Sequence, residues 1–292
     1  MRLRRRLDLE LVRRRLVSSR AEAQEAIVQG RVTVDGAPAL KATTQIHRSQ
    51  NVVVSGTPRL FVSRGGDKLT AALERFAVPV QGLRCLDAGA STGGFTDCLL
   101  QHGAGHVIAV DVGYGQLAER VRRDPRVTVL ERTNVRNLVA EDIPGPQPDL
   151  VVADLSFISL RLALPALRRV AAPHAEAILL CKPQFEAGRE LVGKGGVVRD
   201  PAVWHTTLLS VAAAADTIGW GAVDVAPSPL TGASGNVEFF LRLAPGAAGE
   251  DLDERIAAAV TDVTASQQKR VPPTFWARQD RSPTYGKRSR SR

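Results

Sequence analysis

The sequence predicts an α/β protein in which a seven-stranded, mostly parallel, doubly wound sheet follows a small α+β domain. Two observations carry this prediction. Between residues 64 and 246, short apolar segments alternate with segments of helical periodicity, which is the rhythm of βαβ units. The first apolar segment runs into a glycine-rich turn that opens a helix, as in nucleotide-binding folds. We expect the last strand to be antiparallel.

The order of elements follows from the same periodicities. Strands are expected at 84–88, 107–111, 127–130, 149–154, 176–181, 222–226 and 237–243. Helices are expected at 66–77, 94–103, 115–124, 160–171 and 202–218.

These elements define four parts of the chain. A small domain covers residues 1–58, a linker covers 59–63, the sheet domain covers 64–246, and a basic tail covers 247–292. Residues 252–266 of the tail have helical periodicity. The rest of the tail is rich in Pro, Ser and Arg, and we expect it to be largely disordered.

The small domain should begin with two helices. Leu9, Val12 and Leu16 recur at helical spacing after Asp8, a candidate N-cap. A second helix is indicated by the capping-box pair formed by Ser19 and the Glu three residues later.

The second helix should end at Gly30, a residue type that is favoured just beyond helix C-termini. Strand 32–34 then leads into a turn at Asp35-Gly36, and another strand covers 51–54.

The net charge of +9 is confined to the two ends of the chain. Residues 1–58 hold 11 Lys and Arg against 5 Asp and Glu, residues 59–248 hold 19 of each, and residues 249–292 hold 9 against 6. Such a concentrated charge indicates a polyanionic partner. Because Arg outnumbers Lys 33 to 6, an Arg-rich genome is the alternative explanation, but it does not account for the neutral middle.

Several classes of protein are disfavoured. No apolar segment approaches the ~20 residues that span a bilayer. The basic residues 1–6 are not followed by the apolar stretch of a signal peptide. Cys85, Cys98 and Cys181 have neither metal-ligand spacing nor the even number of a disulfide framework. We therefore expect a monomeric cytoplasmic protein that holds no metal and does not enter membranes.

The glycine-rich loop follows the first strand of the sheet domain. Its candidate cofactor-binding residues are Asp87, Gly89, Ser91, Gly93, Gly94 and Phe95. Glycines let a backbone approach a ligand closely. The spacing differs from the G-x-G-x-x-G of dinucleotide loops, and the acid suits a ligand with a positive amino or sulfonium group better than a diphosphate.

The next two strand ends carry further candidates. Asp111 lies 24 residues after Asp87 at the carboxyl edge of the sheet, where an acid can accept hydrogen bonds from both ribose hydroxyls of an adenosine. Asn134 follows the third strand and is a candidate for adenine contact, with a purely local role in a turn as the alternative. These positions indicate an adenosine ligand without distinguishing NAD from S-adenosylmethionine.

Polar residues also mark later strand boundaries. Asp154 ends the fourth strand, Lys182 ends the fifth and Glu238 begins the last, while Lys68 lies just ahead of the sheet. Carboxyl ends of parallel strands meet at one edge, so we expect Asp154 and Lys182 to converge. A lysine can lose its proton and act as a base, which an arginine cannot.

The first 55 residues resemble the alpha-L RNA-binding fold, which occurs in a small-subunit ribosomal protein, many pseudouridine synthases and tyrosyl-tRNA synthetases. The resemblance lies in residues 11–13, 18–23 and 30–36. It implies that arginines bind RNA phosphates, and the candidates are Arg4, Arg6, Arg14, Arg20 and, in the next domain, Arg64. The alternative is a small helical domain with a solvated basic face.

The loop pattern Asp-x-Gly-x-x-x-Gly-Gly resembles the first motif of Rossmann-like class I methyltransferases. Lys68, Asp154, Lys182 and Glu238 match the Lys-Asp-Lys-Glu tetrad of FtsJ-type ribose 2′-O-methyltransferases. With residues 111–117, 182–186 and 234–238, these motifs make residues 1–245 resemble the TlyA, or hemolysin A, family of rRNA cytidine 2′-O-methyltransferases. One difference lies in the linker, where the family's Arg-x-Trp-Val is replaced by a sequence with Phe61 in place of Trp.

The resemblance implies S-adenosyl-L-methionine as the cofactor and 16S and/or 23S rRNA in ribosomal subunits as the substrate. Lys182, kept neutral by the charge of Lys68, would be the general base for a ribose 2′-hydroxyl. Asp154 and Glu238 would orient the lysines and the hydroxyl, and Asp154 would also contact the cofactor.

Three other functions are disfavoured by the sequence. A base N-methyltransferase would carry Asn/Asp-Pro-Pro-aromatic after the fourth strand, where this chain has Asp154-Leu155-Ser156-Phe157. A membrane-lytic protein, suggested by the name hemolysin, would need a long apolar segment. A dinucleotide-dependent oxidoreductase is disfavoured by the loop spacing.

Overall fold

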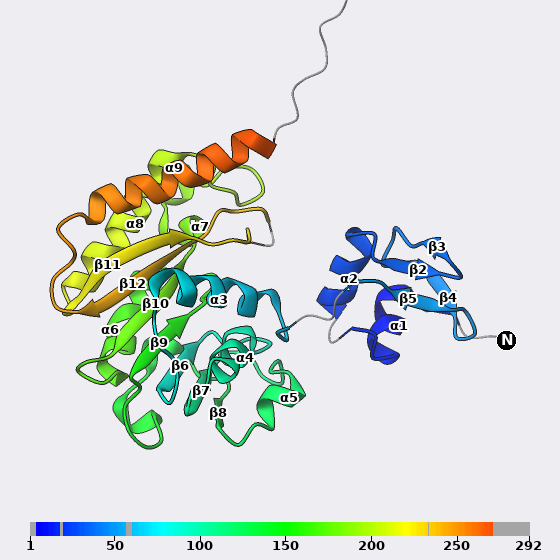
Figure 1. Ribbon diagram of the computed structural model, residues 1–292, viewed down its shortest axis with the longest axis horizontal. Coiled ribbons are helices and arrows are strands. Elements are labelled where there is room, and N and C mark those ends of the chain that lie inside the picture. Colours follow the sequence, from blue (N-terminus) through cyan, green and yellow to red (C-terminus); the bar gives the residue numbers. More distant parts are fainter. Residues whose placement is uncertain (1–3, 18–19, 57–59, 233, 271–292) are drawn as a thin grey trace, which may run out of the picture.

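The computed structural model describes residues 4–17, 20–56, 60–232 and 234–270, and Figure 1 shows their helices and strands. A seven-stranded sheet forms the centre of the larger domain, in the order β11-β12-β10-β9-β6-β7-β8. Its strands are β6 (Arg84–Ala88), β7 (His106–Val110), β8 (Val127–Leu130), β9 (Leu150–Ala153), β10 (Glu176–Cys181), β11 (Trp220–Pro227) and β12 (Phe239–Pro245).

The direction of the strands confirms the predicted topology. β8, β7, β6, β9 and β10 pair in parallel, and β12 is antiparallel to both β10 and β11. The central strands are continuous buried apolar runs, as is usual where helices cover both faces of a parallel sheet. The order of strands changes direction between β6 and β9, so their carboxyl ends border the crevice in which such sheets bind ligands.

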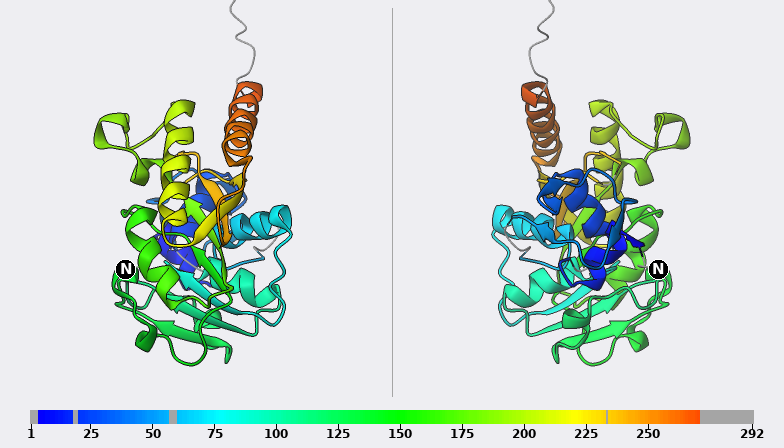
Figure 2. Two further views of the ribbon diagram at one scale, coloured as in Figure 1. Left: turned by 90° about the vertical axis from the view of Figure 1, so that its left-hand side faces the viewer. Right: turned by 90° about the vertical axis from the view of Figure 1, so that its right-hand side faces the viewer.

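Helices cover both faces of this sheet. They are α3 (Arg64–Phe76), α4 (Gly94–Gln101), α5 (Glu119–Arg122), α6 (Leu160–Val170), α7 (Pro183–Glu186), α8 (Pro201–Asp216) and α9 (Leu252–Arg270), with short 3-10 helices η1 (Val135–Asn137), η2 (Ala140–Asp142) and η3 (Arg189–Leu191). One core cluster unites α6, α8 and α9 with one face, and the second unites α3 and α4 with the other. Figure 2 shows α3 opposite α6 and α8 across the sheet.

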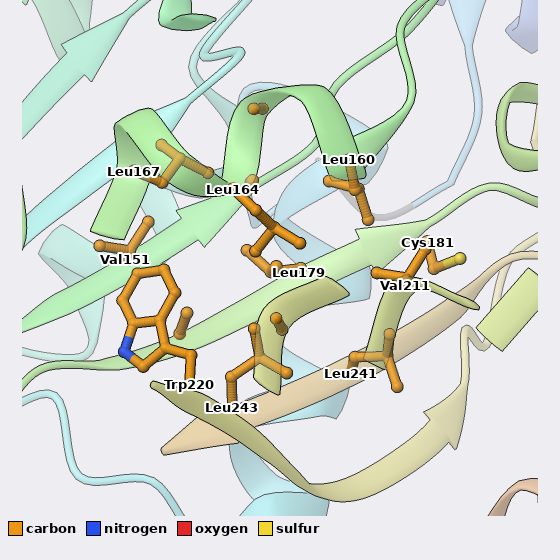
Figure 3. Close-up of a cluster of buried hydrophobic side chains, with 14 of the residues drawn as sticks. Val151, Leu160, Leu164, Leu167, Leu179, Cys181, Val211, Trp220, Leu241 and Leu243 are labelled. Atoms are coloured by element: carbon orange, nitrogen blue, oxygen red, sulfur yellow. The ribbon is translucent and has the colours of Figure 1, made fainter. Parts of the chain in front are cut away.

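The larger core cluster is built around aromatic and branched side chains. Figure 3 shows Leu160, Leu164 and Leu167 of α6 above Val151 and Leu179 of the sheet. Trp220 of β11 lies in the same cluster and is fully buried. Its indole N–H donates a 2.8 Å hydrogen bond to the backbone oxygen of Ala175.

Two predicted elements differ from the structure. The helix expected at 115–124 is only α5 (Glu119–Arg122), because residues 113–115 form a turn in which the Gly115 amide binds Glu131 and Gly115 has φ +68°. The helix expected at 252–266 is α9, which buries Leu252 and Ile256 against the larger core. Part of the predicted tail is therefore packed on the domain, and residues 271–292 lie outside the described residues.

The small domain has two helices and two small sheets. Its elements are β1 (Arg4–Arg6), α1 (Leu7–Arg13), α2 (Arg20–Val28), β2 (Val32–Val34), β3 (Ala37–Pro38), β4 (Gln45–His47) and β5 (Val52–Val54). β1 pairs with β4, and β3-β2-β5 form the second sheet. Gly30 (φ +69°) follows α2, and the turn at Asp35-Gly36 joins β2 to β3, as predicted.

The predicted apolar face of α1 was only partly correct, since Val12 alone of its three residues packs against the core of the small domain. Leu7 and Leu11 are buried, whereas Leu9 and Leu16 are 42% and 39% exposed. The helix begins at Leu7, so Asp8 lies inside its first turn and does not cap it. The capping role predicted for Ser19 falls outside the described residues.

Candidate active site

A cavity of about 650 Å³ opens at the carboxyl ends of β6, β7, β8 and β9; we call it the loop cavity. Five of the predicted cofactor-binding residues line it, namely Gly89, Ser91, Asp111, Asn134 and Asp154. Four strands thus bring together residues that are spread over 66 positions of the sequence, from Gly89 to Asp154, as the topology of the sheet predicted.

Gly89 is held where no side chain fits. Its φ is +86°, and an added Cβ would lie 2.6 Å from the backbone oxygen of Asp154. Its amide donates to the oxygen of Val110 at 2.8 Å, while the Asp154 amide donates to Ala88 at 3.0 Å. The ends of three strands are therefore tied together at this glycine, which sets the floor of the loop cavity.

Asp111 and Asn134 have fixed orientations on the cavity wall. The Asp111 carboxylate accepts hydrogen bonds from the amides of Ser91 (2.8 Å) and Gly113 (2.7 Å). The side-chain Oδ1 of Asn134 accepts a 3.1 Å hydrogen bond from the Arg136 amide and so caps the start of η1. Asn134 has the local role in a turn, and it also lines the cavity, so its predicted contact with adenine stays a prediction.

The other four loop residues do not line the loop cavity. An added Cβ on Gly94 would lie 2.1 Å from the Ser63 hydroxyl, so this glycine allows α3 and α4 to pack closely. Gly93 begins α4 with φ +93° against Leu117. Phe95 is buried and stacks on Phe240 with ring centroids 6.2 Å apart. Packing alone explains these three residue types.

Asp87 lies beneath the loop and not in the cavity. Its carboxyl is fully buried, accepts a 2.6 Å hydrogen bond from the Thr96 hydroxyl, and has a second oxygen without a hydrogen-bond partner among the described residues. Burial raises the pKa of Asp87 to about 7, and the Asp154 and Asp111 carboxylates add to that effect. Asp87 therefore does not line the cavity in which its predicted cationic ligand would lie.

This pKa predicts a pH-dependent stability. Below about pH 4 Asp87 is protonated in both folded and unfolded chains. As pH rises toward 7, the unfolded chain has lost this proton while the folded chain keeps it, so the contribution of Asp87 to stability falls. We therefore expect Asp87→Asn to be more stable than the parent at pH 5 to 8. In urea denaturation, its free energy of unfolding should exceed that of the parent by about 1–4 kcal/mol over this range, with the larger differences at the higher pH.

The control for this measurement is Asp251→Asn. Arg255 lowers the pKa of Asp251, so that carboxyl stays ionised throughout the same range. A stability difference between Asp87→Asn and the parent that does not change with pH would contradict the prediction.

The four predicted catalytic residues form two ion pairs. Lys68 Nζ lies 2.5 Å from Glu238 Oε2, and Lys182 Nζ lies 2.6 Å from Asp154 Oδ1. Lys68, Lys182 and Glu238 line a second cavity of about 360 Å³, which we call the tetrad cavity. Asp154 Oδ1 has no aligned hydrogen-bond donor among the described residues, so its contact with Lys182 is one of charge.

The two cavities share a wall made of Ser156 and Phe157. The Ser156 hydroxyl accepts a 2.8 Å hydrogen bond from Lys182. Phe157 is 92% exposed, has φ +64°, and lies with its ring centroid 5.3 Å from that of Phe185. An exposed aromatic ring in a conformation that costs energy indicates a functional position.

Glu186 supports the wall formed by Ser156 and Phe157 through hydrogen bonds to the loop that follows them. Its buried carboxylate accepts hydrogen bonds from the Ser159 hydroxyl (2.5 Å) and the Leu160 amide (2.7 Å) at the start of α6. The strand end that carries Lys182 is thereby joined to the loop that carries Phe157.

The linker is anchored to the larger domain. The Val62 amide donates to Asp97 Oδ2 at 2.8 Å, and Asp97 also pairs with Arg120. Phe61 is buried, and its ring fills the space above Gly66, where an added Cβ would meet it at 2.2 Å. An aromatic body is therefore needed at position 61 for packing, while Arg59 lies outside the described residues.

The predicted RNA-binding arginines divide into two groups. Arg14 is directed inward, with hydrogen bonds to Glu10 (2.9 Å) and to the backbone oxygens of residues 47, 48 and 50. Arg6 is paired in a bidentate manner with the buried Asp8, and these hydrogen bonds hold the pKa of Asp8 well below its usual range. Both arginines brace the domain.

Of the other arginine candidates, Arg4 and Arg20 are exposed and Arg64 is half-buried. Arg4 is exposed beside His47, and the side chain of Arg20 is 54% exposed although it contacts Asp8. Arg64 begins α3 and donates to the Thr231 oxygen at 2.8 Å. These three have surface from which phosphates could be reached.

Sequence patterns missed several residues of the site. Ser156, Phe157 and Glu186 were recognised as parts of motifs, but none was assigned a role. Their position after a strand end was the available signal. The contacts that give them roles involve residues about 25 to 30 positions away, which periodicity does not reveal.

In the part of the chain that the structure describes, no helix is long and apolar enough to cross a membrane. Those same residues include no group of three or more His, Cys, Asp or Glu side chains placed to hold a metal ion.

The sheet topology, the glycine-rich loop and the two lysine–carboxylate pairs together define a Rossmann-type methyltransferase. Comparison with known families agrees: the FtsJ-like methyltransferase family matches residues 61–244, and the S4 domain matches residues 5–52.

Individual relatives cover most of the chain. The 16S/23S rRNA (cytidine-2′-O)-methyltransferase TlyA of Mycobacterium tuberculosis is 56% identical over 239 residues, which cover 82% of this chain and 89% of the relative. YqxC of Bacillus subtilis is 45% identical over 252 residues, which cover 85% of this chain and 90% of the relative. A solved Streptococcus thermophilus structure that carries a hemolysin name is 34% identical with a TM-score of 0.72, covering 92% of this chain and all of that one. The chain belongs to the FtsJ-like methyltransferase family and, within it, to the TlyA proteins.

Proposed function

We propose that this protein transfers a methyl group from S-adenosyl-L-methionine to the ribose 2′-hydroxyl of a cytidine in 16S and/or 23S rRNA. One observation carries the proposal: Lys68, Lys182 and Glu238 line a cavity that shares a wall with the loop cavity, and Lys182 pairs with Asp154, which lines the loop cavity. The names of the relatives support the choice of cytidine and rRNA.

The loop cavity fits the proposed cofactor. Gly89 lets the ends of β6 and β9 approach closely, since any Cβ there would collide with the Asp154 backbone, and Asp111 presents a fixed carboxylate to a ribose. S-adenosylmethionine, when bound, supplies a methyl group on a positively charged sulfur. Asp154 lines the loop cavity while its Oδ1 contacts Lys182, so its carboxylate would stand beside that charge and next to the tetrad.

The tetrad then handles the proton of the substrate. Lys182 Nζ is positioned to accept the proton of a hydroxyl that enters the tetrad cavity, and Asp154 and Ser156 fix its direction. Lys68, held by Glu238, lines the same cavity and places an ammonium group close to the position of the reacting hydroxyl. Alignment of the hydroxyl with the donor accounts for much of the expected rate.

RNA affinity is assigned mainly to the small domain. Arg4, Arg20 and Arg64 are the candidates with accessible guanidinium groups, while Arg6 and Arg14 support them from within. The substrate would be a ribosomal subunit in the cytoplasm. Binding that depends on phosphates weakens steeply with salt.

The function is tested by labelled methyl transfer onto isolated small and large ribosomal subunits. Digestion and mass spectrometry then locate the methyl group. We expect a cytidine methylated on the ribose. A methyl group on a base, or no transfer to either subunit, would overturn the proposal.

Phe157 is expected to stack on the base of the target nucleotide. Stacking of a base on an aromatic ring contributes about 1–3 kcal/mol, so Phe157→Ala should lower kcat/KM by roughly 5- to 150-fold. Phe157→Tyr keeps the ring and serves as the matched control. If the Tyr and Ala variants lose the same activity, stacking is not the role of this side chain.

A further inference from the structure

One wall of the tetrad cavity is a glycine hairpin formed by residues 193–197, between η3 and α8. The Gly193 amide donates to the Val197 oxygen at 3.1 Å, and the Gly196 amide donates to the Gly193 oxygen at 3.1 Å. Gly195 and Gly196 line the same cavity as Lys68, Lys182 and Glu238.

The two glycines are required by backbone conformation and not by packing. Gly195 and Gly196 have φ values of +79° and +74°, and an added Cβ on either would meet nothing within 4 Å. The hairpin therefore presents bare backbone beside open space. The Gly195 amide has no hydrogen-bond partner among the residues that the structure describes.

Asn236 clamps this hairpin from below. Its side chain is almost completely buried, its Oδ1 accepts from the Val198 amide at 3.0 Å, and its Nδ2 donates to the Gly196 oxygen at 2.8 Å. The Trp204 indole adds a 3.0 Å hydrogen bond to the Val198 oxygen. Asn236 lies two residues before Glu238. Its hydrogen bonds therefore fix the position of the hairpin relative to the tetrad.

The hairpin carries one free positive charge. Lys194 lies between Gly193 and Gly195 and is exposed, and no carboxylate within the described ranges pairs with it. The charges of the tetrad cancel in two pairs. Backbone amides and an ammonium group, without bulky side chains, favour an anion with oxygen acceptors such as a phosphodiester.

We propose that the hairpin binds the phosphodiester group next to the target ribose, through Lys194 and the backbone at Gly195, and that Asn236 is the positioning residue that holds it there. This inference rests on the proposed function, since a 2′-hydroxyl in the tetrad cavity brings its own phosphates to the cavity wall.

The test compares Lys194→Ala, Asn236→Ala and the double variant with the parent. Subunit binding is measured over a salt series, and methyl transfer is measured as kcat and KM. For Lys194→Ala we expect KM to rise about 3- to 10-fold, kcat to stay within about twofold, and the salt slope to fall by about 1. Asn236→Ala should lower kcat/KM at least about 10-fold with unchanged cofactor affinity.

The double variant decides whether Asn236 acts through the hairpin. Once the clamp is lost, removal of Lys194 should add little, because the two residues share one element. Fully additive effects would overturn the positioning role, and an unchanged salt slope in Lys194→Ala would overturn the phosphate site. The control is Arg123→Ala, which removes an exposed positive charge just after α5, where it pairs with Glu119, and should change neither quantity.

Two further measurements keep the outcomes separate. Asn236→Asp retains the acceptor for Val198 and loses the donor to Gly196, so it should be intermediate; it replaces Asn236→Ala if that variant does not fold. Activity of Asn236→Asp equal to the parent would overturn the clamp. If the parent binds subunits but transfers no methyl group, the proposed function fails, while the salt series still tests the phosphate site.

Discussion

Lys182→Ala is expected to lower methyl transfer by about 10²- to 10⁴-fold while cofactor affinity changes less than about twofold. That range is the usual contribution of a general base. Lys182 contacts Asp154 at 2.6 Å and Ser156 at 2.8 Å in the tetrad cavity, but it does not line the loop cavity. Single-turnover assays and equilibrium cofactor binding measure the two quantities separately.

Lys182→Arg is the control that separates a base from a positive charge. An arginine keeps the charge beside Asp154 but does not give up its proton in proteins. We expect this variant to be almost as inactive as Lys182→Ala. Substantial activity in Lys182→Arg would show that Lys182 acts by charge, and a large loss of cofactor affinity in either variant would make it a cofactor-binding residue.

Gly89→Ala is expected to abolish cofactor binding and to destabilise the fold by about 2–5 kcal/mol. The left-handed backbone costs an alanine about 1–2 kcal/mol. The new Cβ would also lie 2.6 Å from the Asp154 oxygen, and relief of such a clash in a packed region costs about 1–3 kcal/mol. Moving Asp154 would disturb both cavities. Thermal unfolding and cofactor titration test the two effects.

Gly219→Ala separates backbone strain from collision. Gly219 has φ +77°, but an added Cβ would meet nothing within 4 Å. It lies between α8 and β11, away from both cavities. We expect a stability loss of about 1–2 kcal/mol and unchanged methyl transfer. If Gly219→Ala and Gly89→Ala behave alike, contact with the Asp154 backbone does not matter.

The fold was largely predictable because its signals are local. Every strand of the large sheet was predicted to within about two residues at each end, since buried parallel strands are continuous apolar runs bounded by polar turns. The element that failed, the helix expected at 115–124, depends on a turn held by Glu131 from the next strand. The prediction for α1 was incorrect in another respect, namely which of its side chains are buried. That face is set by contacts with the rest of the small domain and not by the spacing of apolar residues.

The candidate site was predictable at strand ends and less so elsewhere. Gly89, Asp111 and Asp154 line the loop cavity as expected, because parallel strands deliver their ends to one edge. Gly94 and Phe95 have the sequence signature of the loop but serve the packing of α3 and α4 against the sheet. A motif does not distinguish a residue that contacts a ligand from one that supports it.

The sequence by itself determined the order of strands and helices, the position of the glycine-rich loop and the candidate residues of the tetrad, since hydrophobic periodicity and residue type are properties of short segments. Only the tertiary structure decided which lysine pairs with which carboxylate. Lys68 meets Glu238 across 170 residues, Asp87 is buried beneath its loop, and Arg14 turns inward. These outcomes depend on the packing of distant elements, which fixes distance and burial and therefore the charge that each group carries.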